Sequence, residues 1–193
     1  MACILLAGRR RPRAAATPAP SARGVMVVLK QLLVATDFGE PAAVALDYGR
    51  ELARAFGATL HLVHVVDDLN ARALGLTGFP EHLPALVGAQ HDLEEAARGA
   101  LDRLLTEDDR RRINTKTVVL SALTPAPAIL EYAKGAMVDL IVAGTHGRGA
   151  VAHLFMGSVA ERLVRSAPCP VLTVRHPERE FLRPDALQAT TTH

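Results

Sequence analysis

A glycine-rich segment late in the chain has residue types and a spacing that suit the binding of a phosphate group. Gly144 and Gly147 are followed, nine residues later, by Gly157 and Ser158, and the segment comes directly after the apolar run 138–143. Glycines let the backbone approach an anion, because no Cβ stands in the way. A helix that begins near Ser158 would add unpaired N–H donors and a partial positive charge. The segment therefore predicts a nucleotide-binding site.

The order of the glycines excludes two common phosphate-binding loops. The segment is not a P-loop, because no Lys-Ser or Lys-Thr pair follows a glycine at the required offset. It is also a poor dinucleotide fingerprint, because Gly144, Gly147 and Gly149 follow a G-x-x-G-x-G order and lie late in the chain. The spacing G-x2-G-x9-G-S therefore belongs to another kind of loop.

This spacing resembles that of the ATP-binding universal stress proteins, and the resemblance covers roughly residues 30–176. The segment 33–38 is similar to the family's first strand with its terminal aspartate, 62–66 to its second strand, and 167–174 to its last strand. The resemblance implies an ATP ligand, Asp37 at the adenosine portion, the backbone of Val65 at the adenine, and Ala35 near the ribose.

The glycine segment itself suggests roles at the phosphates. Gly144 and Gly147 would permit the turn and the close approach, and the N–H groups of Ser158 and Val159 would donate to phosphate oxygens. The alternative is structural: the glycines only cap a strand, and Asp37 only caps the following helix. The candidate ligand-binding residues are Ala35, Asp37, Val65, Gly144, Thr145, His146, Gly147, Arg148, Gly157, Ser158 and Val159.

Two further observations bear on this site. Gly39 stands where family members often have a serine, and Glu40 would repel a nearby phosphate if it faced the site. His146 and His153 lack neighbouring Cys or carboxylate partners, so no protein-held metal is expected. Mg²⁺ or Mn²⁺ carried by the triphosphate needs few protein ligands.

Short apolar runs alternate with helical patterns, which predicts an α/β fold with a parallel sheet and helices on both faces. The expected strands are 31–36, 58–66, 115–120, 138–143 and 170–175, and the expected helices are 41–56, 91–105, 127–134 and 157–166. The family resemblance implies a single doubly wound five-stranded sheet in the order 3-2-1-4-5, which places Asp37 beside Gly144 at the switch point. The residue pattern alone also allows the order 2-1-3-4-5.

Other segments carry weaker signals. Residues 67–90 contain three glycines and two prolines, which favours a long loop that is either a lid, a partner surface or a surface insertion. The run 107–112 is interpreted as a solvated helix end. Gly135 is expected to close a helix, His64 to be a satisfied core histidine, and Cys169 to be a buried, inert thiol.

Composition divides the chain of 193 residues into a basic leader and a mildly acidic remainder. Six of its 22 basic residues and none of its 20 acidic residues lie in residues 1–36, which leaves 16 basic against 20 acidic residues beyond them. That charge argues against nucleic-acid binding.

We expect a disordered Ala/Pro-rich leader at 1–28, with Met1 or Met26 as the start, a nucleotide-binding domain at 29–176 and a tail at 177–193. Two distant cysteines and no apolar run of membrane-spanning length favour a cytoplasmic protein.

The leading functional hypothesis is an ATP-binding, homodimeric stress-response regulator or nucleotide sensor with an unidentified downstream partner. The resemblance implies that the dimer forms through the last strand, Pro170–Arg175. No activated nucleophile or acid–base pair is evident, so no catalytic residue is predicted and ATP hydrolysis is expected to be slow at most. The alternatives are a slow ATP hydrolase of the same fold and a nucleotide-free dimeric interaction module.

Overall fold

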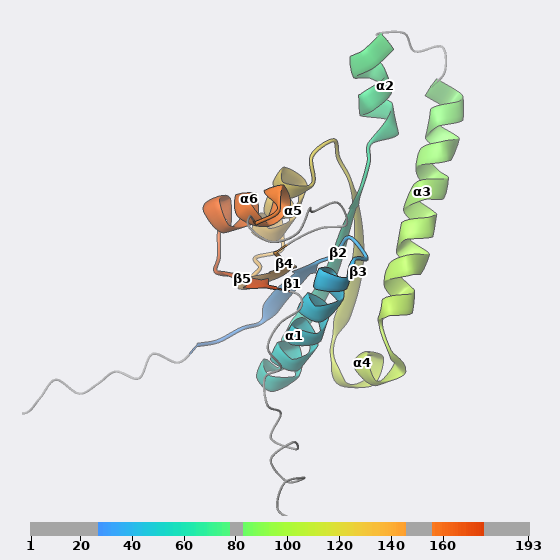
Figure 1. Ribbon diagram of the computed structural model, residues 1–193. Coiled ribbons are helices and arrows are strands. Elements are labelled where there is room, and N and C mark those ends of the chain that lie inside the picture. The colour runs from blue at the N-terminus through green and yellow to red at the C-terminus, as the bar shows by residue number, and fades with distance from the viewer. Residues whose placement is uncertain (1–26, 78–82, 146–155, 176–193) are drawn as a thin grey trace, which may run out of the picture.

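The computed structural model describes residues 27–77, 83–145 and 156–175, which form helices packed on a central sheet (Figure 1). Most of the predicted leader and tail lies outside these residues, and both remain predictions. In chain order the elements are β1 (Gln31–Ala35), α1 (Glu40–Phe56), β2 (Thr59–Val66), α2 (Leu69–Thr77), α3 (Leu83–Leu104), α4 (Glu107–Arg112), β3 (Thr115–Ser121), α5 (Pro125–Gly135), β4 (Leu140–Gly144), α6 (Ser158–Ser166) and β5 (Val171–Val174).

The sheet has five parallel strands in the order β3-β2-β1-β4-β5. This confirms the doubly wound order expected from the family resemblance and excludes 2-1-3-4-5. The central strand β1 places Leu33 opposite His61 of β2 and Ile141 of β4. Its residues 32–34 have no solvent-exposed area, as expected for a strand covered on both faces.

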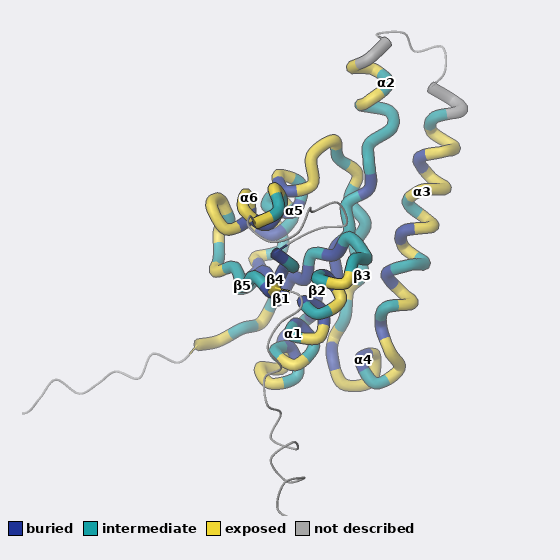
Figure 2. Tube along the Cα trace, in the orientation of Figure 1, coloured by how far each residue is buried: buried dark blue, intermediate teal, exposed yellow. Residues whose placement is uncertain are grey.

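Two hydrophobic cores lie on opposite faces of the sheet, because successive strand residues point to opposite sides. Leu32 and Val34 face the core that is closed by α1 and α3, and Leu33 faces the core that is closed by α5 and α6. Figure 2 shows the buried residues concentrated along the strands and the sheet-facing sides of these helices. The prediction of helices on both faces is confirmed.

The ends of two helices are built on left-handed residues. Gly57 follows α1 with φ of 63°. The corresponding residue after α5 is Met137, with φ of 50°, and not Gly135, which is the last helical residue. The N–H of Val138 donates to the carbonyl of Ala133 at 2.9 Å, which closes the α5 turn. The helix does end at Gly135, but the left-handed residue beyond it is Met137, so the expectation that Gly135 closes the helix was only partly right.

The expected loop at 67–90 is largely helical, because α2 and the first part of α3 occupy it. Figure 1 shows α2 beyond the ends of the strands, beside the first part of α3, whereas the rest of α3 runs alongside β3. A β-carbon added at Gly75 or Gly88 would meet no atom within 4 Å, so these glycines mark exposed helix positions. Pro84 is the second residue of α3, where a proline removes no helical hydrogen bond.

A polar network connects α2 and α3 to the end of β3. Gln90 is 7% exposed, and its Oε1 accepts the N–H of Leu69 at 2.9 Å. Its Nε2 donates to Ser121 Oγ at 3.1 Å and to Glu94 Oε1 at 3.0 Å. The hydrogen bonds of Ser121 and Gln90 lower the pKa of Glu94 below its ordinary value. The network anchors the start of α2 at the carboxyl edge of the sheet.

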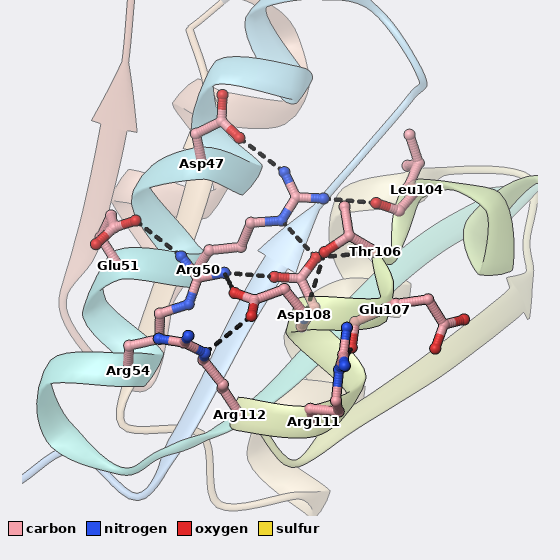
Figure 3. Close-up of polar contacts among 11 residues, drawn as sticks. Asp47, Arg50, Glu51, Arg54, Leu104, Thr106, Glu107, Asp108, Arg111 and Arg112 are labelled. Carbon is pink, nitrogen blue, oxygen red and sulfur yellow. Dashed lines mark hydrogen bonds and ion pairs between the residues drawn. The ribbon is translucent and has the colours of Figure 1, made fainter.

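The charged run 107–112 is the separate helix α4, and it includes a fully buried carboxylate, so its interpretation as a solvated helix end was wrong. Asp109 is 0% exposed. Arg50 Nε donates to Asp109 Oδ2 and Arg54 Nη2 donates to Oδ1, each at 2.9 Å. Figure 3 shows how the two α1 arginines extend toward α4. Thr106 and Asp109 also form a capping box at the start of α4.

The charge state of Asp109 follows from these contacts. Burial alone would raise its pKa, but the hydrogen bonds from Thr106 and the positive charge of Arg50 outweigh burial and lower the pKa below its ordinary value. Asp109 is therefore a charged group that joins α1 to α4, and its removal would leave two arginines without their shared partner.

The core histidine is His61 rather than His64. His61 is 1% exposed, and its Nδ1 and Nε2 lie 2.7 Å from Tyr132 Oη and Gln31 Oε1, respectively. Burial lowers the pKa of His61, and the positive charge of Lys116 lowers it further. His64 is half-buried, with Nδ1 at 2.7 Å from the carbonyl oxygen of Thr36.

We predict that Asp109→Ala lowers the free energy of unfolding by about 3 kcal/mol. This value is at the low end of the range for breaking a buried ion pair, because Arg54 keeps 28% of its side chain exposed. Urea unfolding of both proteins measures this. The matched control is Asp108→Ala, which removes an acid that is 48% exposed and should cost less than about 1 kcal/mol. Equal losses in the two variants would contradict the structural role given to Asp109.

Protonation of His61 should destabilise the fold. The folded-state pKa of His61 lies below its ordinary value of 6.5, so the unfolded chain takes up the proton first as the pH falls. The stability contributed by neutral His61 is therefore present above the unfolded-state pKa and is lost as the pH falls through the folded-state pKa. We predict that the difference in free energy of unfolding between the parent and His61→Gln shrinks from about pH 7 to about pH 5. A pH-independent difference would contradict this prediction.

Candidate functional site

A cavity of about 400 Å³ lies at the carboxyl ends of β1, β2 and β4. Its size falls within the range of small-molecule sites. It brings together eight of the predicted site residues, while His146, Gly147 and Arg148 lie outside the described residues. The lining residues come from six elements and the turns that follow the strands: Ala35, Thr36, Asp37, Ala42, Val63, His64, Val65, Pro125, Ile129, Ala143, Gly144, Thr145, Gly157, Ser158, Val159 and Ala160.

One end of the cavity is the N-terminus of α6. Gly157 is the N-cap, and its N–H donates to the carbonyl of Thr145 at 2.7 Å. The N–H of Thr145 donates in turn to the carbonyl of Val174 at 2.7 Å, so β5 supports the position of this turn. The N–H groups of Ser158, Val159 and Ala160 have no acceptor within the helix. This end of the cavity can therefore hydrogen-bond an anion.

Apolar side chains also line the cavity. Val63 and Val65 come from β2, and Pro125 and Ile129 come from α5. The N-terminus of α5 is a poorer anion site than that of α6, because Pro125 and Pro127 in its first turn have no N–H. The cavity thus combines a wall suited to a flat, weakly polar group with a donor-rich end.

Asp37 lines the cavity directly after β1. Its Oδ1 accepts the N–H of Gly39 at 3.0 Å, so the carboxylate also stabilises the turn that leads into α1. Phe38, between them, has a φ of 65°, which is rare for a bulky residue. Glu40, the first residue of α1, is exposed and does not line the cavity.

Gly144 has a packing role that the sequence did not reveal. A β-carbon on Gly144 would lie 2.8 Å from Pro41 Cβ and 2.9 Å from its carbonyl carbon. The missing side chain therefore admits the first turn of α1 against the end of β4. This packing against α1 differs from the strand-capping role raised as the structural alternative, and Gly144 also lines the cavity.

Sequence reasoning missed several lining residues, including Thr36, His64, Pro125 and Ile129. Pro125 and Ile129 follow β3, and only the strand order brings the start of α5 to the same edge as Asp37 and Gly144. The sequence did carry one signal for these residues, namely their place after a predicted strand. Residues that follow parallel strands meet at one edge of the sheet.

The described residues include neither a metal-binding cluster nor a membrane-spanning helix. No three His, Cys, Asp or Glu side chains among them gather closely enough to hold a metal ion. No described helix is long and apolar enough to cross a membrane.

Cys169 is half-buried, and burial raises the pKa of its thiol, with a further contribution from Asp139. That environment keeps the thiol protonated and unreactive.

The chain is a doubly wound α/β protein with a cavity at its switch point, the place where open parallel sheets of this class bind their ligands. The model of the Universal stress protein family matches residues 29–175. The chain therefore belongs to the universal stress protein family. Its relatives include Universal stress protein MJ0531 of Methanocaldococcus jannaschii, which is 30% identical over 78% of this chain and 85% of its own length. A universal stress protein of Thermus aquaticus is 32% identical over 77% of this chain and all of its own length.

Solved structures show the same fold. The universal stress protein UspA from Lactobacillus plantarum is 25% identical and superposes with a TM-score of 0.64 over 78% of this chain and the whole of its own. The structure of MJ0577 gives a TM-score of 0.63 at 25% identity, over 79% of this chain and the whole of its own. The share of this chain that superposes on these structures is similar to the share that the family model matches.

We predict that Gly144→Ala destabilises the fold by about 1–3 kcal/mol, because the methyl group would press on the backbone of Pro41. Urea unfolding measures the loss. Gly135→Ala is the matched control, since it adds the same methyl group at a helical position with no atom within 4 Å. The control should be neutral or stabilise by up to about 1 kcal/mol. An unchanged stability of Gly144→Ala would contradict the packing role.

Proposed function

We propose that this protein binds ATP in the cavity at the carboxyl edge of the sheet and acts as a nucleotide-sensing regulator of a stress response. The observation that carries the proposal is the lining of one cavity, which includes apolar residues from β2 and α5, the N-terminus of α6, and Asp37 after the central strand. A nucleotide presents a flat base, ribose hydroxyls and an anionic chain, and these groups match the three parts of the cavity.

The orientation of the ligand follows from the donors that each helix offers. The triphosphate would lie at α6, where the N–H groups of Ser158, Val159 and Ala160 and the positive end of the helix dipole favour an anion. The adenine would lie against Val65 and Ile129, because Pro125 and Pro127 deprive α5 of comparable donors. The proposed ligand therefore spans the cavity from β2 to α6.

Asp37 belongs at the adenosine end in this arrangement. A carboxylate repels phosphate, whereas it accepts hydrogen bonds from ribose hydroxyls. Ala35, the last residue of β1, also lines the cavity and is proposed to lie near the ribose. The remaining phosphate contacts are proposed for Gly147 and Arg148, with Thr145 and His146 completing the loop. Mg²⁺ or Mn²⁺ would be bound mainly by the triphosphate itself.

The energetics allow a useful affinity. Each charge-assisted hydrogen bond to phosphate contributes roughly 1.5–3 kcal/mol. Three or four such bonds, less the cost of association, are compatible with micromolar binding. The same bonds would stabilise ground and transition states about equally, so we propose that ATP is held and hydrolysed slowly at most.

We also propose a homodimer that pairs β5 with the same strand of a second copy. In the described part of the chain β5 pairs with β4 alone, which leaves its other edge available. Its residues Val171, Leu172 and Val174 make this edge apolar, and exposed apolar edges promote association. A two-fold axis would let the two edges pair. The proposed domain, residues 29–176, would then be the dimerising unit.

We predict that Ser158→Pro weakens ATP binding more than tenfold and leaves adenosine binding within about threefold. Proline at this position removes an N–H and a hydroxyl, and losing one charge-assisted bond corresponds to roughly a tenfold change or more. The helix should survive, because Ser158 is the first residue of α6, where proline is favoured, and Gly157 already has the ψ of 149° that a following proline requires. Isothermal titration measures both affinities.

Ser158→Ala is the matched control for this variant. It removes the hydroxyl and keeps the N–H, so the difference between the two variants reports the backbone donor. Thermal unfolding of each variant establishes that the fold is intact. Unchanged ATP affinity in a folded Ser158→Pro protein, or an equal loss of adenosine affinity, would contradict the proposed orientation, and absence of ATP binding by the parent would contradict the proposed function.

A further inference from the structure

The turn that carries Asp37 is strained. Phe38 adopts a left-handed φ of 65°, although it has a bulky side chain that disfavours this region. Strain of this kind persists where the surrounding structure holds the backbone in place, and it is concentrated at functional sites. The contacts that hold Phe38 therefore identify the residues that determine where Asp37 lies.

His64 of β2 contacts this turn at two residues, Thr36 and Phe38. Its Nδ1 lies 2.7 Å from the carbonyl oxygen of Thr36, and its ring centroid lies 4.4 Å from that of Phe38. A carbonyl oxygen only accepts hydrogen bonds, so Nδ1 carries the proton and donates it. His64 thus contacts the residues on both sides of Asp37, one by a hydrogen bond and the other by ring packing.

Thr36 completes the support of this turn. It is 8% exposed, and its N–H donates to the carbonyl of Val63 at 2.9 Å. Its Oγ1 accepts the N–H of Phe38 at 3.0 Å. The carbonyl that His64 holds therefore belongs to a residue that is itself fixed to β2, which leaves the turn little freedom to rotate.

We propose that His64 is a positioning residue for the ligand site: it holds the strained turn 36–39 so that the Asp37 carboxylate stays in the nucleotide cavity. The inference rests on the proposed ATP binding and adds a residue that acts through Asp37. The hydrogen bond to Thr36 determines the position of the turn, and the contact with Phe38 keeps its left-handed conformation. Loss of the hydrogen bond lets the carboxylate leave its position and weakens the binding of the adenosine portion.

The test compares two substitutions of His64 in the full-length chain by isothermal titration with ATP and Mg²⁺. His64→Phe keeps a ring against Phe38 and removes the donor to Thr36, and it should weaken ATP binding about tenfold. His64→Asn loses the ring but keeps an N–H donor near the position of Nδ1, and it should remain within about threefold of the parent. Weaker binding by His64→Asn than by His64→Phe would overturn the role of the hydrogen bond.

A double-mutant cycle with Asp37→Ala separates positioning from a general loss of structure. If His64 acts through Asp37, His64→Phe should change ATP affinity less than about twofold in the Asp37→Ala background. A full tenfold loss in that background would overturn the inference, because it would show that His64 acts independently of the carboxylate. If thermal unfolding shows that His64→Phe does not fold, His64→Ala takes its place in the cycle with the same expected outcomes.

The outcomes distinguish this inference from the proposed function. Failure of the parent to bind ATP overturns both. ATP binding by the parent together with an additive cycle overturns only the role of His64, and binding together with the expected non-additive cycle supports both.

Discussion

The fold and its candidate site depend on the position of β1 between β2 and β4. The chain adds strands outward from β1 through β2 to β3, then returns and adds β4 and β5 on the other side. Because β-α-β connections are right-handed, this reversal of direction also changes the face on which the connecting helices pack. Helices α1 and α3 therefore cover one face and α5 and α6 the other, as the two hydrophobic cores show.

That reversal creates the cavity. At the carboxyl ends of β1 and β4 the connecting segments leave toward opposite faces, so no helix fills the space between them. The close packing of Pro41 against Gly144 then determines how near α1 can approach, and the buried contact of Asp109 with Arg50 joins the same helix to α4. Residues distant from the cavity thus contribute to its shape by holding the helices that border it.

Sequence reasoning predicted the strands, the flanking helices and the candidate residues that meet at the switch point, because apolar periodicity and glycine spacing are local signals. It could not decide the strand order from the residues alone, and the family resemblance was needed. Residues 67–90 were misread because Gly75, Gly88 and Pro84 are loop signals in sequence, yet each occupies a helix position that tolerates it. Asp109 was hidden in a charged run, although Thr106 three residues before it was a capping signal. The role of Gly144 depends on Pro41, over a hundred residues earlier, which no local pattern reports.

The central claim is that one cavity holds a nucleotide with its phosphates at α6 and its base between β2 and α5. The most direct test is an NMR titration that follows the backbone amides of Ser158, Val159 and Ala160 and the methyl groups of Val65 and Ile129. If the nucleotide lies in this way, ATP with Mg²⁺ should shift both sets of signals, whereas adenosine should shift the methyl signals alone. Amide signals of 158–160 that do not move with ATP, or shifts confined to residues outside this cavity, would contradict it.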